Sequence, residues 1–205
     1  ILFLSDNGGC HEAIYTWGLL HDTSGEIGGP DFFDSYGYPW ANASNTPFRL
    51  FKHWTLEGGI ASPFIAHWPA GIKAGQLDTQ GVGHIIDVMA TCVDITDAVY
   101  PESYKGHPVR PMEGKSLVPQ WQGSADTNRV LYWEHEGNWA VRKGDWKLVN
   151  SYKVSGVLDN EPELYNVKAD RTELVNLAAD NPGIVQELLA LYQTWKQRVG
   201  VYEFR

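Results

Sequence analysis

The chain begins with four consecutive apolar residues, Ile1-Leu2-Phe3-Leu4, which run directly into the polar stretch Ser-Asp-Asn-Gly-Gly. An unbroken apolar run that ends at turn-forming residues is typical of a strand buried on both faces, as in α/β sheets that carry helices on each side. Natural chains usually start with a methionine, a targeting segment or a polar lead-in. The beginning therefore predicts an interior strand of an α/β fold and reads as the start of a piece of a longer protein.

The composition indicates a globular protein. With 205 residues, of which 43% are hydrophobic and 20% charged, the chain can bury a substantial core. The net charge is −9 and the 16 lysines and arginines are scattered, which argues against a nucleic-acid partner. Cys10 and Cys92 form neither a disulfide scaffold nor a cysteine-rich zinc pattern. No apolar run approaches the roughly 20 residues that span a bilayer, so no membrane span is predicted.

The first part of the chain reads as strand, loop, strand and helix. Residues 5–50 are rich in Gly, Asp, Ser, Asn and Pro, so we expect a long irregular segment, whose aromatics between Phe32 and Trp40 suit stacking on a sugar ring or an aryl group. Residues 61–69 predict a second short buried strand. Residues 82–99 predict a helix, because their apolar positions are close to helical spacing. Those positions are Ile85, Ile86, Met89, Val93, Ile95 and Val99.

The pattern changes at about residue 126. Short alternating or aromatic-rich runs at 129–150 and 162–167, separated by Gly, Asp and Lys, predict a small antiparallel sheet. An amphipathic helix is predicted for 182–199, with Leu188, Leu191 and Trp195 buried against that sheet. We therefore divide the chain into a first part, 1–125, and a second part, 126–205.

Two stretches offer residues for chemistry. Asp6 and Asn7 follow a predicted strand and carry hard oxygen ligands, which suit Ca²⁺ or Mg²⁺; alternatively, the stretch is a simple turn. Lys52 precedes Glu57-Gly58-Gly59 and a predicted strand, and its ammonium group suits an anionic oxygen; alternatively, it is a surface lysine. Neither stretch decides the function alone.

Together these stretches closely resemble sulfatases, the formylglycine-dependent enzymes of the alkaline-phosphatase-like superfamily. The segment "FLSDNGG" is similar to the family's metal-binding strand and turn, and "KHWTLEGGIASP" to its lysine signature. The segment "GHIIDVMAT" resembles the family's His-x-x-Asp-x-x-Pro-Thr helix, with Ala90 where proline is usual. Residues 133–149 and 163–182 resemble the family's carboxyl-terminal subdomain. These matches occur in family order over nearly the whole chain.

The resemblance implies the carboxyl-terminal part of an alkaline-phosphatase-like α/β sandwich, plus a small antiparallel sheet packed by a carboxyl-terminal helix. It implies that Asp6 and Asn7 coordinate Ca²⁺, in preference to Mg²⁺, and that Lys52 is the catalytic residue that contacts a sulfate oxygen or the leaving oxygen. The family's nucleophile motif, Cys/Ser-x-Pro-x-Arg, occurs at neither Cys10 nor Cys92. We therefore expect the formylglycine in a missing amino-terminal half, and we expect this chain alone to be inactive and to bind calcium weakly.

The expected substrate is a sulfated small molecule or carbohydrate, and an aryl sulfate fits equally well. A phosphodiester or phosphonate monoester hydrolase of the same superfamily is an alternative reaction class, because such enzymes can share the metal-binding end and the formylglycine. A non-catalytic interaction module with a vestigial site is a second alternative. The resemblance favours a periplasmic or secreted location, while the oligomeric state and the particular sulfate ester cannot be read from the sequence.

Histidines are not assigned to catalysis. His11 is either close to the site or an ordinary loop histidine. His84 and Asp87 lie three residues apart on a predicted helix, so we expect them to stabilise helix packing. His135, between two glutamates, either lines the substrate mouth or only joins the sheet.

Overall fold

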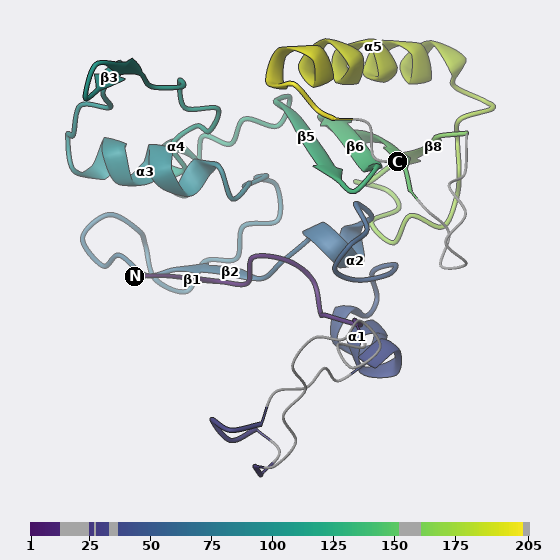
Figure 1. Cartoon of the computed structure of the whole chain (residues 1–205), viewed down its shortest axis with the longest axis horizontal. Coiled ribbons are helices and arrows are strands. Elements are labelled where there is room, and N and C mark those ends of the chain that lie inside the picture. The colour runs from purple at the N-terminus through teal and green to yellow at the C-terminus, as the bar shows by residue number, and fades with distance from the viewer. Residues whose placement is uncertain (13–24, 27, 33–36, 152–160, 203–205) are drawn as a thin grey trace. The chain divides into compact units, whose positions relative to one another are not determined.

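The computed structural model describes residues 1–12, 25–26, 28–32, 37–151 and 161–202 (Figure 1). The chain divides into two compact units, one formed by Ile1–Phe3 and Ile65–Arg129 and the other by Leu4–Phe64 and Val130–Arg205. We call them the first and the second unit. The sequence-based division into 1–125 and 126–205 stays a prediction. In the described part of the chain, no helix is both long and apolar enough to cross a membrane.

The second unit is built on a four-stranded antiparallel sheet. Its strands, in spatial order, are β5 (Val130–His135), β6 (Asn138–Lys143), β7 (Trp146–Asn150) and β8 (Glu163–Asn166). His135 pairs with Asn138, so the first hairpin turns within two residues. Glu136 and Gly137 have φ values of 51° and 85°, as a type I′ turn requires, and this turn matches the twist of the strands. The sheet predicted from the alternating runs is confirmed.

Successive side chains of a strand point to opposite faces of a sheet, and both faces of this sheet are covered. On one face, the apolar cluster consists of Leu56, Ala140, Val149, Tyr165 and Val167. On the other face, it consists of Val141, Leu148, Leu164, Leu188 and Tyr192. Helix α5 (Pro182–Val199) covers the second face, and the segment leading into the short helix α2 (Glu57–Ile60) covers the first (Figure 1). The sheet therefore links α2, which follows the lysine signature, to the carboxyl-terminal helix.

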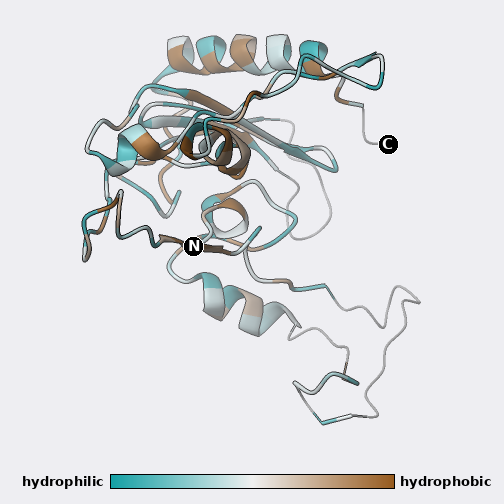
Figure 2. Cartoon of the chain, turned by 90° about the vertical axis from the view of Figure 1, so that its left-hand side faces the viewer, coloured by the Kyte–Doolittle hydropathy of each residue, from teal (hydrophilic) through white to brown (hydrophobic). Residues whose placement is uncertain are grey.

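Helix α5 has the bounds that the sequence predicts. It starts with Pro182, whose fixed φ suits the first helical turn, and it ends at Gly200 in the left-handed conformation, with φ 73°. Hydrophobic and hydrophilic residues alternate along it (Figure 2). Leu188 is buried as predicted, whereas Leu191 and Trp195 are only half-buried. These two residues pack against the same cluster. The predicted apolar face of the helix is therefore correct, but not all of its residues are fully buried.

The two strands predicted for residues 1–4 and 61–69 are present, but the prediction that they are buried is wrong. Strands β1 (Leu2–Leu4) and β2 (Phe64–Ala66) form a separate two-stranded sheet. Ile1 and Phe3 are 86% and 68% exposed, and Ile65 of β2 is 60% exposed. The strand positions are right, but among the described residues no third strand joins this pair.

The expectation of an irregular segment over residues 5–50 is also corrected. Helix α1 spans Gly37–Asn45, and Ala41 on it is fully buried. Pro39 suggested a loop, but a proline in the first turn of a helix removes no intrahelical hydrogen bond. Much of the remaining segment, including Phe33 and Tyr36 among the aromatics proposed for stacking, lies outside the described residues.

The first unit contains α3 (Asp87–Ile95), β3 (Ser103–Tyr104), β4 (His107–Pro108) and α4 (Val118–Trp121). The predicted helix is shorter than 82–99, and its buried side carries Asp87, Ala90 and Thr91. Of the apolar positions that indicated this helix, Ile85, Ile86, Met89, Ile95 and Val99 are exposed. The helix is present as predicted, and its inner side instead carries polar residues with strong partners.

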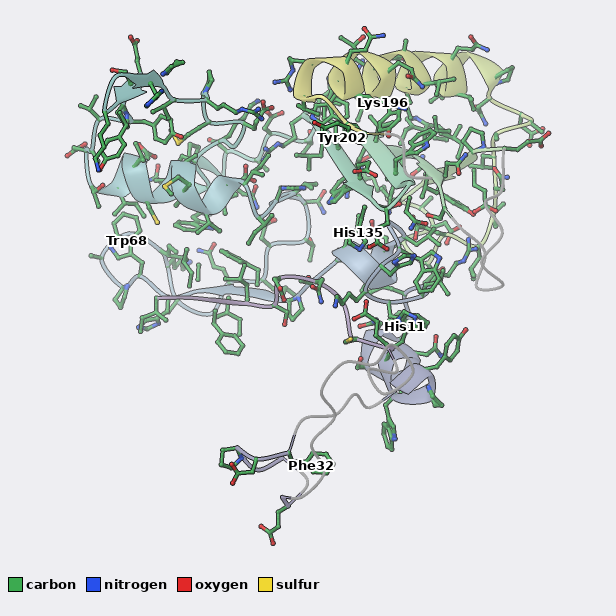
Figure 3. The ribbon with its side chains drawn as sticks, in the orientation of Figure 1. His11, Phe32, Trp68, His135, Lys196 and Tyr202 are labelled. Atoms are coloured by element: carbon green, nitrogen blue, oxygen red, sulfur yellow. The ribbon has the colours of Figure 1, made fainter. Side chains whose placement is uncertain are left out.

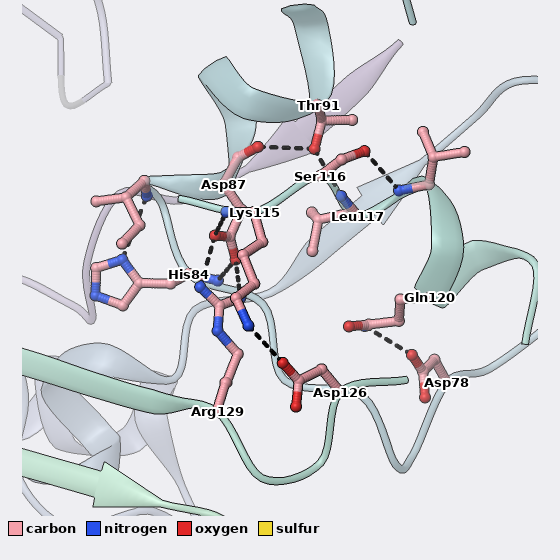
Figure 4. Close-up of polar contacts among 12 residues, drawn as sticks. Asp78, His84, Asp87, Thr91, Lys115, Ser116, Leu117, Gln120, Asp126 and Arg129 are labelled. Atoms are coloured by element: carbon pink, nitrogen blue, oxygen red, sulfur yellow. Dashed lines mark hydrogen bonds and ion pairs between the residues drawn. The ribbon is translucent and has the colours of Figure 1, made fainter. Parts of the chain in front are cut away.

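Asp87 is the centre of those partners (Figure 4). Its carboxylate makes two hydrogen bonds, of 2.7 and 2.9 Å, with the Arg129 guanidinium. It also accepts hydrogen bonds from the backbone N–H groups of His84, at 2.8 Å, and Lys115, at 3.0 Å. A fully buried carboxylate is stable only when it is paired in this way. Asp87 therefore has the packing role that the sequence predicts.

Candidate functional site

The Asp6-Asn7-Gly8-Gly9 turn docks on the Glu-Gly-Gly motif through the backbone. The Gly8 N–H donates to the Gly59 carbonyl at 2.9 Å. A Cβ atom on Gly8 would lie 1.9 Å from the Gly58 carbonyl oxygen, closer than any real contact. Glycine is therefore required at position 8 because two backbones meet there. The two sequence signatures, fifty residues apart, form one structural unit.

A second set of backbone contacts places Lys52 beside the same turn. The Lys52 N–H donates to the Gly9 carbonyl at 3.0 Å. The Gly9 N–H donates to Asn45 Oδ1 at 3.0 Å, and Asn45 Nδ2 donates to the Leu50 carbonyl at 3.1 Å. Asn45, the last residue of α1, thus joins the turn to the segment that carries Lys52. The structure brings together all three residues predicted from the sequence.

The side chain of Lys52 is paired with Glu12, a residue that sequence reasoning missed. Lys52 Nζ lies 2.7 Å from Glu12 Oε2, and Cys10 Sγ donates to the same oxygen at 3.3 Å. The hydrogen bond to Glu12 is the main reason that the pKa of Lys52 is raised, and the charge of Asp6 adds to it. The same hydrogen bond lowers the pKa of Glu12. Both groups are therefore charged at neutral pH.

The predicted metal ligands lie at the surface of the turn. The Asp6 side chain is exposed and Asn7 is half-buried. Asn7 Nδ2 donates to the Gly8 carbonyl at 2.7 Å, which assigns the amide nitrogen to the turn, so Oδ1 is the atom through which Asn7 would ligate an ion. A carboxylate and an amide oxygen suit a hard cation such as Ca²⁺. The donor chemistry of Asp6 and Asn7 thus fits the predicted ion.

His11 lies in an aromatic cluster next to this turn. Its ring centroid is 4.4 Å from that of Phe51 and 5.1 Å from that of Trp54. Burial is the main reason that the pKa of His11 is lowered. Tyr38 of α1 packs edge-on against Phe51, whereas Trp40 is 69% exposed. Of the aromatics proposed for sugar stacking, Trp40 is therefore exposed and Tyr38 contacts the core.

A second polar cluster joins His53 to the tip of the β5–β6 hairpin. His53 Nδ1 lies 3.3 Å from Glu136 Oε2, and the rings of His53 and His135 are nearly perpendicular, with centroids 5.5 Å apart. Asn138, which is fully buried, places its Nδ2 3.3 Å from His53 Nε2. Figure 3 shows His135 and His11 among the side chains of this unit. Sequence reasoning considered His135 but not His53, although His53 follows Lys52 directly.

A buried ionic cluster fixes the Glu-Gly-Gly motif on the sheet. Lys147 of β7 is fully buried, and its Nζ lies 3.0 Å from Glu57 Oε1 and 2.8 Å from Glu173 Oε1. The Glu57 N–H also donates to Glu173 Oε2 at 2.7 Å. Burial opposes ionisation of Glu57, but Lys147 and Arg171 outweigh it and the pKa of Glu57 is lowered. Glu57 is therefore a structural residue that anchors α2.

Comparison with known proteins gives the family. A model described as the carboxyl-terminal region of N-sulphoglucosamine sulphohydrolase matches residues 48–197. An uncharacterized sulfatase of Schizosaccharomyces pombe is 29% identical over 214 aligned residues, covering 98% of this chain and 38% of its own length. The N-acetylgalactosamine-6-sulfatase of Canis lupus familiaris is 33% identical over 110 residues, covering 53% of this chain and 20% of its own length. The chain thus spans less than two fifths of the length of these relatives.

Solved structures show the same fold. A chain reported with a versatile core genetic locus for glycosaminoglycan metabolism in Bacteroides thetaiotaomicron aligns over 96% of this chain and 38% of its own, with a TM-score of 0.67 and 23% identity. A complex with its substrate D-glucosamine-2-N,6-O-disulfate aligns over 72% of this chain and 31% of its own, with a TM-score of 0.52 and 22% identity. Since the family model covers well over half of its residues, the chain belongs to the N-sulphoglucosamine sulphohydrolase C-terminal family and has the α/β fold of the sulfatases.

Proposed function

We propose that this chain is the carboxyl-terminal part of a sulfuric ester hydrolase, to which it contributes a calcium-binding turn and a sulfate-contacting lysine. The supporting observation is the backbone docking that places Lys52 next to the Asp6-Asn7 turn. The nucleophile, a formylglycine in the family that the sequence resembles, comes in this proposal from a segment outside these 205 residues.

Lys52 has the charge that sulfate recognition needs. Its raised pKa keeps the ammonium group protonated, and its half-buried position limits screening by water. In the proposed reaction it donates to a sulfate oxygen or to the leaving oxygen, so the substrate takes the place of Glu12 at Lys52 Nζ. A donor aimed at developing negative charge typically contributes ~10²–10³ in rate.

Asp6 and Asn7 are the proposed calcium ligands. Ca²⁺ takes 6–8 oxygen ligands, and these two side chains supply about three, so the rest come from water or from the segment that carries the nucleophile. When bound, the ion would neutralise negative charge on the sulfate group. Mg²⁺ fits less well because it demands near-ideal octahedral geometry. By itself, the chain is expected to hold Ca²⁺ only in the ~10⁻⁴–10⁻³ M range of weak sites.

For the substrate, we propose a sulfated carbohydrate. Its support is the family description, N-sulphoglucosamine sulphohydrolase, and the relative named N-acetylgalactosamine-6-sulfatase. The exposed indole of Trp40 at α1 offers a flat apolar face of the kind that sugars bind. An aryl sulfate remains a useful assay substrate because it presents the same sulfate ester.

The test is the Lys52→Ala variant in the full-length protein. We expect kcat for sulfate ester hydrolysis to fall by at least ~10²-fold, because the variant loses a point charge aimed at developing negative charge. Lys73→Ala, at an exposed lysine of the first unit, is the matched control and should keep normal turnover. Near-normal turnover of Lys52→Ala would contradict the assigned role. Faster hydrolysis of an aryl phosphate ester than of the aryl sulfate would favour the phosphodiester or phosphonate alternative.

A further inference from the structure

The cluster of His53, His135 and Glu136 has no part in the sulfatase mechanism proposed above. His53 lies on the segment that carries Lys52, and the other two residues lie at the β5–β6 hairpin tip. One ligand atom from each residue can be chosen so that all three lie within 4.8 Å of one another. Two imidazoles and a carboxylate are a ligand set that zinc enzymes use, with water in the fourth position.

The distances suit a tetrahedral ion. Ligands at about 2.0–2.1 Å from zinc are roughly 3.3–3.4 Å apart along a tetrahedral edge. His53 Nδ1 and Glu136 Oε2 are already 3.3 Å apart. His135 is exposed at the hairpin tip, so a rotation of its side chain can close the remaining distance.

The backbone holds two of the three ligands firmly. His53 has φ 98°, a conformation that costs energy for any residue except glycine, and the surrounding structure maintains it. Glu136 occupies the first position of the type I′ turn, with φ 51°. The buried Asn138 side chain links the two segments, because its Nδ2 lies 3.2 Å from the His135 carbonyl and 3.3 Å from His53 Nε2.

Both ring nitrogens of His53 contact polar groups of the cluster. As placed, Asn138 donates to His53 Nε2, which leaves a proton on Nδ1 for Glu136. A metal ion on Nδ1 would replace that proton, and a neutral ring would then carry its proton on Nε2. The Asn138 amide would have to turn its oxygen toward the ring and give up its bond to the His135 carbonyl. The metal-free contact and the proposed metal site thus share His53 and Glu136.

We propose that His53, His135 and Glu136 bind a divalent transition-metal ion of the zinc class, with one open coordination position. This site is chemically distinct from the Asp6-Asn7 turn. Imidazole ligands favour Zn²⁺ and Co²⁺, whereas carboxylate and amide oxygens favour Ca²⁺. The bound ion would tie the β5–β6 hairpin to the segment that carries Lys52.

The test is a titration of the 205-residue chain with Co²⁺, followed by its visible absorption, and with Zn²⁺, followed by calorimetry. We expect one equivalent of Co²⁺ to give the intense visible bands of a tetrahedral site, and Zn²⁺ to displace it while excess Ca²⁺ does not. Binding should weaken at least about tenfold in His135→Ala, which removes one ligand, and in Glu136→Gln, which replaces the charged carboxylate by a neutral and weaker amide oxygen. His107→Ala, at an exposed histidine of the first unit, should bind as the unchanged chain does.

Two results would overturn the proposal. One is the absence of a saturable Co²⁺ signal, which would mean that the cluster is only a hydrogen-bonded contact. The other is binding that neither His135→Ala nor Glu136→Gln weakens, which would place the ion elsewhere. Circular dichroism of each variant checks that the fold is retained. Because both variants change surface side chains at the hairpin tip, we expect it to be.

Discussion

Lys52 Nζ and Glu12 Oε2 lie 2.7 Å apart, so the lysine proposed to contact sulfate is already neutralised by a carboxylate of the same unit. Any anionic substrate must compete with Glu12 for this ammonium group. The pair is half-exposed, so exchange of one anion for another requires no unfolding of the site.

Removing the charge of Glu12 should therefore strengthen sulfate binding. In Glu12→Gln of the full-length protein, we expect the inhibition constant of inorganic sulfate to fall roughly two- to tenfold, the equivalent of one net hydrogen bond. Competitive inhibition assays measure this. Glu187→Gln, which removes the partner of the exposed Lys143, is the control and should leave sulfate inhibition unchanged. Weaker sulfate binding in Glu12→Gln would mean that Glu12 positions Lys52 and does not compete for it.

Replacing Gly8 should disturb the Asp6-Asn7 turn. In Gly8→Ala, the new Cβ would meet the Gly58 carbonyl oxygen at 1.9 Å, so the two backbones must separate. We expect the chain to lose at least ~1–3 kcal/mol of unfolding free energy, as for an overpacked core. Gly183→Ala is the matched control, because nothing lies within 4 Å of its Cβ in the first turn of α5. Urea denaturation compares the two, and equal stability would refute the close contact.

The buried Lys147 should be essential for stability at neutral pH. Lys147→Met leaves Glu57 and Glu173 facing each other without their shared cation, and we expect a loss of ~3–5 kcal/mol at pH 7. Lys143→Met, at a surface ion pair, should cost less than ~1 kcal/mol.

The loss in Lys147→Met should depend on pH in a defined direction. Burial already raises the pKa of Glu173, and without Lys147 the carboxylates bind protons more tightly in the folded chain than in the unfolded one. The penalty is then largest above the folded pKa and shrinks as the pH falls toward the unfolded value. Chemical denaturation at pH 7 and pH 5 measures this, and a penalty independent of pH would argue against two ionised carboxylates.

The packing of helix α5 on the sheet should depend strongly on the side chain of Leu188. Leu188 is 1% exposed and lies in the cluster between α5 and the sheet, so Leu188→Ala should cost ~2–5 kcal/mol. Leu174→Ala, at a leucine that is 73% exposed, should change the unfolding free energy by no more than ~0.5 kcal/mol. Thermal or urea unfolding of both variants tests the difference, and similar values would show that α5 does not pack as described.

The sequence predicts those parts of the fold that depend on local periodicity. The alternation in 130–150 indicates strands that pair with the next strand in the chain, and the apolar face of α5 indicates a helix that packs on this sheet. Burial of β1 and β2 was predicted wrongly, because an apolar run shows only that a residue can be buried and not that a covering surface is present. In α3, Asp87 and Thr91 are buried because Arg129 and the backbone at 115–117 provide partners that no local pattern reveals.

In the candidate site, too, local motifs could be found from the sequence, whereas contacts between distant residues could not. Asp6, Asn7 and Lys52 belong to contiguous motifs and could be selected from the sequence. Glu12 and His53 could not, because their partners lie 40 and more residues away along the chain. A glutamate two residues after a cysteine carries no signal until the fold brings Lys52 to it.

The contacts of Gly8 and Gly9 with Gly59, Asn45 and Lys52 have an evolutionary consequence. The bonds of Gly8 with Gly59 and of Gly9 with Lys52 join main-chain atoms and do not depend on side-chain identity, whereas the bond of Gly9 with Asn45 needs the asparagine side chain. Closing a loop twice as long costs only ~0.6 kcal/mol more. A change of length between residues 10 and 44 can therefore leave the Asp6-Asn7 turn in place, provided that Glu12 keeps its contact with Lys52 and that α1 keeps Ala41 buried.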